Sequence, residues 1–235
     1  MSLTPDLVAR VHREMPEPGW PPGTTRLTDA DFAGLARDLL APIPTGQDIW
    51  IFACGSLIWK PAFAIEEQRP AMLRGWHREF CIRVVGFRGS PDCPGLMMGL
   101  ERGGACRGVM QRIAGDTAPQ RLDQLLRREM SFKPATNRPR WVTVESEGER
   151  RPAIAITVDR RGVAYAGRHS AEATAAILAR ACGHWGSGAE YLMNTVAHLE
   201  ALGIHDRYLW KLQGLVAEKI HAGTASVDGA AVNAR

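Results

Sequence analysis

The sequence feature that most constrains the fold is an apolar run that ends in a glycine-serine turn. The run covers residues 49–53 and leads directly into Gly55 and Ser56, and the segment closes at Pro61. This pattern is typical of a buried strand that opens into a tight turn. Glycine has no side chain and can take positive φ, so a ligand can approach the backbone N–H groups closely. The turn is therefore a candidate site for a carboxylate, although an ordinary turn has the same pattern.

Composition indicates a globular protein and limits its partners. The chain has 235 residues, of which 45% are hydrophobic, so it can bury a sizeable core. No window approaches ~18 uninterrupted apolar residues and no basic n-region precedes an apolar segment, so we expect neither a membrane segment nor a secretory signal. The net charge of +4 favours an anionic small molecule as partner over nucleic acid, for which no motif is present.

The cysteines indicate a reducing compartment. There are five, an odd number, and their spacing matches no metal-ligand motif. We therefore expect free thiols, a cytoplasmic location and no bound metal. The five positions are Cys54, Cys81, Cys93, Cys106 and Cys182.

Three regions are predicted along the chain: a helical, proline-rich N-terminal extension over 1–47, one domain over 48–221, and a disordered tail over 222–235. Within the extension, Thr4-Pro5 can begin a short helix, and Thr28 with Asp31 forms a capping box for a second helix. Between them, four prolines exclude a helix and predict a strap lying over the surface. They are Pro16, Pro18, Pro21 and Pro22.

The central region reads mostly as strands and the last part as helices. Turn markers such as Gly103-Gly104 separate the strands. Strands followed by helices, with little room for crossovers, predict an α+β domain built on a small barrel or strongly curved sheet. The predicted strands are 50–54, 80–87, 96–100, 108–113, 141–145 and 153–158. The predicted helices are 117 to 129 or 130, 171–182 with Gly183 as its stop, 189–202 with Gly203 as its stop, and 206–221.

An ordered set of short segments resembles one known family. The turn Gly55–Pro61 is similar to the glycine-serine-leucine signature of ChaC-type γ-glutamylcyclotransferases. Further segments of that family follow in the same order and cover about residues 48–220. They are Arg74–Phe80, Arg88–Pro91 with Pro94–Leu96, Cys106–Val109, Arg127–Met130, Arg138–Trp141, Glu190–Val196 and Leu202–Asp206.

The resemblance implies a small mixed β-barrel flanked by helices, with no cofactor. It implies that a γ-glutamyl peptide, glutathione in the ChaC branch, is cyclised to 5-oxoproline with release of cysteinylglycine. Glu129 matches the catalytic acid/base, and the strand-to-turn loop matches the substrate-binding segment. The loop residues are Cys54, Gly55, Ser56, Leu57, Ile58 and Trp59. Two alternatives remain: a γ-glutamylamine cyclotransferase with another leaving group, or a catalytically weak binding or regulatory protein.

The chemistry of cyclisation needs few protein groups. The nucleophile is the substrate's own α-amine, and an intramolecular attack gains a large effective molarity once the substrate is held folded. One carboxylate must remove a proton from the ammonium and return it to the leaving nitrogen. Glu129 ends a predicted helix, where the macrodipole raises a carboxyl pKa. Arg127 and Arg128 would lower it, but consecutive helix residues diverge by about 100°, so we expect them to face elsewhere.

The remaining candidates have competing interpretations. Cys54 could be a nucleophile, but no Cys/His signature surrounds it and a small buried hydrophobe is the commoner role. Tyr191 is either a substrate-binding residue or a core tyrosine, whereas Asn194 and Thr195 are expected to stabilise helix packing. The chain departs from the family in having Cys54 where a tyrosine is usual. It also lacks a tyrosine in residues 131–137.

Overall fold

In the computed structural model, the described residues are 1–19 and 23–232, with side chains described as far as 223. The chain divides into two compact units, each built from segments distant in sequence. The first contains residues 1–19, 80–97 and 166–235, and the second contains residues 20–79 and 98–165. The predicted N-terminal extension is therefore shared between the two units.

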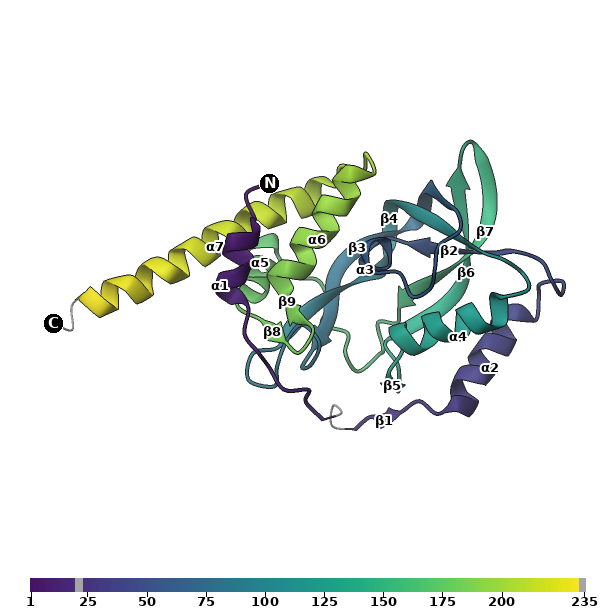
Figure 1. Cartoon of the computed structure of the whole chain (residues 1–235), viewed down its shortest axis with the longest axis horizontal. Helices are drawn as coiled ribbons and strands as arrows, with labels where there is room; N and C mark the ends of the chain where they lie inside the picture. The colour runs from purple at the N-terminus through teal and green to yellow at the C-terminus, as the bar shows by residue number, and fades with distance from the viewer. Residues whose placement is uncertain (20–22, 233–235) are drawn as a thin grey trace. The chain divides into compact units, whose positions relative to one another are not determined.

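The second unit is built on a closed β-barrel with strand order β2-β4-β3-β6-β7 (Figure 1). β2 pairs antiparallel with β4, with Phe52 opposite Met110, and parallel with β7, which closes the barrel. Buried side chains such as Phe52, Leu73 and Met110 fill its interior. The expected α+β fold with a small mixed barrel is confirmed. The strands are β2 (Ile49–Ala53), β3 (Gln68–Val84), β4 (Gly95–Ile113), β6 (Asn137–Ser146) and β7 (Glu149–Val158), and the division into units assigns residues 80–84 of β3 and 95–97 of β4 to the first unit.

Three helices and a short sheet complete the second unit. The helices are α2 (Asp29–Leu40), α3 (Ser56–Trp59) and α4 (Ala118–Glu129). The capping box of α2 is present as predicted, with Asp31 N–H donating to Thr28 Oγ1 at 3.3 Å. α2 packs on α4, which turns Leu122, Leu125 and Leu126 inward. The sequence did not predict the short antiparallel pair of β1 (Thr25–Arg26) with β5 (Phe132–Lys133).

The first unit is mainly helical, and α1, α5 and α6 pack against α7 (Figure 1). Thr4 caps α1 as predicted, and residues 12–19 form neither helix nor strand; Pro21 and Pro22 lie outside the described residues. Its helices are α1 (Pro5–Val11), α5 (Ala171–Leu178), α6 (Gly188–Ala201) and α7 (Arg207–Val232). A small hairpin joins β8 (Cys182–Gly183) to β9 (Gly186–Ser187).

Several predicted boundaries are wrong. The predicted strands 96–100 and 108–113 are one strand, β4, in which Gly103 and Gly104 have φ of +106° and +67° without ending it. Glycines at positive φ inside a strand bend it as a bulge does, so they mark a kink instead of a turn. α5 ends before Gly183, which lies in the β8–β9 hairpin. α7 continues past His221 to Val232, so the backbone of 222–232 is helical where a disordered tail was expected.

Candidate active site

The predicted turn after β2 is a single turn of helix. α3 begins at Ser56 with Gly55 as its N-cap, and Ile58 N–H donates to the Gly55 carbonyl at 2.9 Å. Gly55 has φ of −138°, so the expectation of positive φ at this residue is wrong. The first N–H groups of a helix have no intrahelical acceptor, and Gly55 supplies no capping side chain. Such N–H groups can bind a carboxylate, and the carboxylate site predicted for this turn stays a prediction.

Buried polar side chains of the barrel hold the backbone around this turn. Gln111 is fully buried, and its Nε2 donates to the Leu57 carbonyl at 3.1 Å. Arg78, also buried, donates through Nε to the Cys54 carbonyl at 3.1 Å and through Nη2 to the Arg107 carbonyl. Neither residue was predicted, because a Gln or an Arg inside a strand carries no sequence signal of the loop that it contacts.

Glu129 is the last residue of α4, as predicted, and its side chain is only 19% exposed. Burial raises the pKa of its carboxyl, while the Arg128 guanidinium, with Nε 3.4 Å from Oε1, lowers it. Asn137 Nδ2 donates to the Glu129 carbonyl at 2.7 Å and fixes the end of the helix. A carboxyl with a raised pKa suits a group that must both accept and return a proton.

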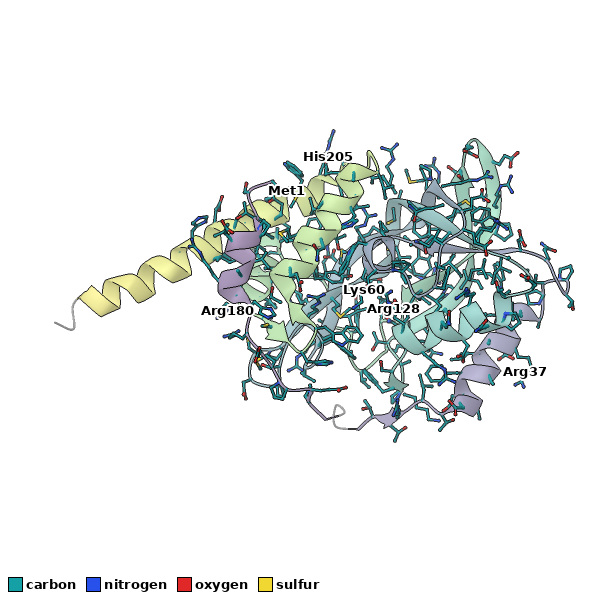
Figure 2. The ribbon with its side chains drawn as sticks, viewed as in Figure 1. Met1, Arg37, Lys60, Arg128, Arg180 and His205 are labelled. Carbon is teal, nitrogen blue, oxygen red and sulfur yellow. The ribbon has the colours of Figure 1, made fainter. Side chains whose placement is uncertain are left out.

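Arg128 joins Glu129 to the turn. Besides its ion pair with Glu129, its Nη2 lies 3.3 Å from Ser56 Oγ and its Nη1 donates to the Lys60 carbonyl. Figure 2 labels Arg128 and Lys60 close to each other, in agreement with this hydrogen bond to the Lys60 backbone. One guanidinium therefore bridges the two parts of the predicted site, Glu129 and the segment Ser56–Trp59.

The expectation that both arginines face away from Glu129 is wrong for Arg128. Arg127 does point elsewhere, because it pairs with Asp123 at 2.7 Å and with Asp29 at 2.8 Å. The backbone divergence of about 100° holds for Cα–Cβ directions. A long arginine side chain can fold back along the helix end, and only the folded structure shows that Arg128 does so.

Cys54 lies half-buried between the turn and the barrel core. A hydrogen bond with the Cys106 thiol, together with burial, raises the pKa of Cys54 well above its usual value. A thiol with a raised pKa forms little thiolate, which is the nucleophilic form. The position therefore favours the packing role for Cys54 over the nucleophilic one.

The structure divides the predicted substrate-binding residues between the two units. The segment from Cys54 to Trp59 lies with Glu129 in the second unit, with Leu57 buried and Ile58 and Trp59 half-buried. Tyr191 lies on α6 in the first unit, 3% exposed, edge-on to the Phe80 ring at 6.1 Å. The Arg88 guanidinium lies 5.9 Å from the Tyr191 ring and pairs with Glu190.

Two features are absent from the described part of the chain. No group of three or more His, Cys, Asp or Glu side chains is arranged to hold a metal ion. Among the helices described, none is long and apolar enough to cross a membrane.

Comparison with known proteins adds to this geometry. The family model for ChaC-like proteins matches residues 49–219. The glutathione-specific γ-glutamylcyclotransferase of Escherichia coli K12 is 36% identical over 168 residues, covering 71% of this chain and 72% of the relative. The γ-glutamylcyclotransferase 2-3 of Arabidopsis thaliana is 29% identical over 177 residues. The match covers 72% of this chain and 88% of the relative.

A solved structure has the same fold. The crystal structure of a yeast γ-glutamyl cyclotransferase specific to glutathione superimposes with a TM-score of 0.66. It covers 74% of this chain and all of the yeast chain at 21% identity. At that identity the likeness concerns the fold alone, whereas the family model and the bacterial relative concern the sequence. The chain belongs to the ChaC-like protein family.

Proposed function

We propose that this protein is a γ-glutamylcyclotransferase that degrades glutathione to 5-oxoproline and cysteinylglycine. The observation that carries the proposal is the bridge formed by Arg128, which links a largely buried carboxyl of raised pKa to Ser56 at the start of α3. The relatives at 36% and 29% identity are cyclotransferases by name, which supports the same activity.

The proposed reaction begins with the γ-glutamyl head held by its α-carboxylate. The N–H groups at the start of α3 donate hydrogen bonds to this carboxylate, and the Arg128 guanidinium beside Ser56 supplies a positive charge. Gripping one end of the head leaves the α-amine and the γ-carbonyl free to approach each other. Because the attack is intramolecular, this restraint supplies a large part of the rate.

Glu129 then performs the proton transfers. Its carboxylate removes a proton from the α-ammonium, whose reference pKa is about 8, and the free amine attacks the γ-carbonyl. The tetrahedral intermediate collapses when the C–N bond to cysteinylglycine breaks and Glu129 returns the proton to the leaving nitrogen. The ring nitrogen also loses its second ammonium proton, which Glu129 passes on to the departing amine. The products are therefore the neutral five-membered lactam and cysteinylglycine with a protonated amine, so protons and charges balance without a second reactant.

The direct test is incubation of the purified protein with glutathione and measurement of 5-oxoproline and cysteinylglycine. Equal amounts of the two products support the proposal. A γ-glutamylamine should be tested in parallel, since 5-oxoproline from that substrate alone would establish the alternative leaving group. Binding of glutathione with no product would favour a binding or regulatory protein.

We also propose that the protein tolerates a range of γ-glutamyl dipeptides. Cys54 stands where the family usually has a tyrosine, and residues 131–137 contain none. A smaller side chain at the turn leaves more room around the substrate head. Side-by-side kcat/KM values should therefore discriminate less among dipeptides than those of a relative with both tyrosines.

The free thiols support the proposal of a cytoplasmic location. All five cysteines are free. Unpaired thiols persist in reducing compartments, so we place the protein in the cytoplasm. Fractionation of cells that express the tagged protein tests this location.

A further inference from the structure

A second candidate site lies on the barrel between β3 and β6. The two strands pair at Met72–Glu145 and Leu73–Val144. Side chains from both strands line an open pocket of about 510 Å³. Its volume is within the range of small-molecule sites. Arg102 of β4 and Arg150 of β7 complete a rim of side chains from four strands.

The pocket has an excess of positive charge. Four arginines and one glutamate line it: Arg74, Arg102, Arg140, Arg150 and Glu145. Arg74 is neutralised, because its Nη2 lies 2.9 Å from Glu145 Oε2 and its Nε lies 3.0 Å from both carboxylate oxygens. Among the described residues, neither Arg102 nor Arg140 forms an ion pair with a carboxylate, so their charges remain for a ligand.

Arg102 and Arg140 are held over a single indole. Their guanidinium carbons lie 4.8 Å and 5.4 Å from the centre of the Trp76 ring, which is 8% exposed. Cation–π attraction holds each guanidinium against the Trp76 ring. It also brings two positive charges close together on the same ring. An anion between them would relieve this repulsion.

Arg140 is oriented for two-point recognition. Its Nε donates to Thr157 Oγ1 at 2.8 Å, and this fully buried hydroxyl donates in turn to the Arg138 carbonyl at 3.0 Å. Anchoring at Nε leaves both Nη groups of Arg140 without a partner among the described side chains and backbone. The two Nη groups form the planar fork that binds a carboxylate or a phosphate in a bidentate manner.

We propose that the pocket formed by Trp76, Arg102 and Arg140 binds the carboxylate or phosphate group of a small molecule. One source of this group is the terminal carboxylate of the peptide substrate, in which case the inference rests on the proposed function. The other source is a separate small anion.

The experiment compares Arg140→Gln and Arg102→Gln with the wild-type protein and with Arg37→Gln. Arg37→Gln removes the same charge from an exposed position of α2, outside the pocket. Two substrates are used, glutathione and glutathione amidated at its terminal carboxylate. Binding of inorganic phosphate is measured separately by calorimetry, which does not depend on turnover. If Arg140→Gln fails to fold, Arg102→Gln still tests the proposal. Arg102 makes no side-chain hydrogen bond among the described residues, so its replacement breaks none.

Each outcome decides the proposal. If the carboxylate of the substrate binds here, the KM for glutathione rises at least about tenfold in both variants while kcat is retained. For the amidated substrate, the variants and the wild type then have the same KM. If a separate anion binds, KM stays constant but both variants lose the phosphate binding of the wild type. The proposal is overturned if both variants match Arg37→Gln in KM and in phosphate binding. If the wild type produces no 5-oxoproline, the proposed function fails, and phosphate calorimetry alone decides the pocket.

Discussion

Replacing Glu129 by glutamine is the sharpest test of the proposed chemistry. Glutamine keeps the length of the side chain and an oxygen that can accept from Arg128 Nε, which lies 3.4 Å from Oε1 in the native structure. The hydrogen bond from Asn137 is made to the backbone carbonyl of Glu129, so it survives the change. The two contacts of Arg128 with Ser56 and Lys60 use its Nη atoms and are also retained.

The substitution therefore removes charge and proton transfer while leaving the turn in place. A positioned acid/base contributes about 10²- to 10⁴-fold, so kcat should fall by that factor, or by about 3 to 5 kcal/mol in activation free energy. KM should change by less than about threefold, because the groups proposed to hold the α-carboxylate are unchanged. The assay is 5-oxoproline formation from glutathione over a range of substrate concentrations and pH values.

Stability should move in the opposite direction. Because burial raises the pKa of Glu129, the folded protein binds this proton more tightly than the unfolded chain does. The free energy of unfolding therefore falls as pH rises above the unfolded value of about 4.3. Glu129→Gln should be more stable than the wild type at neutral pH and equal to it at about pH 3.5, where both states are protonated. Thermal unfolding at the two pH values measures this difference.

The matched control is Glu149→Gln, which removes an exposed carboxylate of β7 that pairs with Arg151. It should keep normal kinetics and show no such gain in stability. Near-normal 5-oxoproline formation by Glu129→Gln would refute the assignment of Glu129. Glu190 would then be the next carboxylate to replace, with the loss of its ion pair to Arg88 taken into account.

Four further substitutions, at three positions, test the candidate site and the barrel beside it. Arg128→Gln should lower kcat/KM by about 10- to 100-fold and move the acid limb of the pH–rate profile upward, since the guanidinium lowers the pKa of Glu129. Arg128→Lys should not restore activity, because an ammonium cannot contact both Ser56 and Lys60; equal kinetics for the lysine variant would contradict the bridge. Gly108→Ala places a Cβ 2.4 Å from the Ala53 carbonyl oxygen, so urea denaturation should show about 1 to 3 kcal/mol less stability, and an unchanged midpoint would contradict this contact. Gly55→Val should weaken glutathione binding, because its side chain fills the space beside the first N–H groups of α3; normal binding would place the carboxylate site elsewhere.

The barrel strands and most helices could be predicted from the sequence, because their sequence signals are local. The pair Thr28 and Asp31 predicted the start of α2, and the spacing of the leucines in α4 predicted the face of that helix that is buried. The full length of β4 could not be predicted, because the Gly103-Gly104 pair has the composition of a turn. In the barrel the pairing of long strands outweighs this local preference and converts a turn signal into a bend.

The candidate site divides in the same way. Glu129 and the Gly55–Trp59 turn could be located from motifs, since each is a short contiguous segment. The side chains that join and support them, Arg128, Gln111 and Arg78, come from three different elements. Their roles depend on which carbonyls the fold brings within reach, and no spacing in the sequence encodes that.

Arg128 imposes opposing demands on the site. Its charge is needed beside the turn, where it fixes Ser56 and Lys60 and attracts an anionic head. The same charge lies against Glu129 and lowers its pKa, which alone would make the carboxylate a weaker base. Burial of Glu129 opposes this effect and exceeds it, since the net shift of the pKa is upward. The buried end of α4 thus lets one cation organise the substrate-binding turn while the adjacent carboxyl remains basic enough to accept a proton from an ammonium.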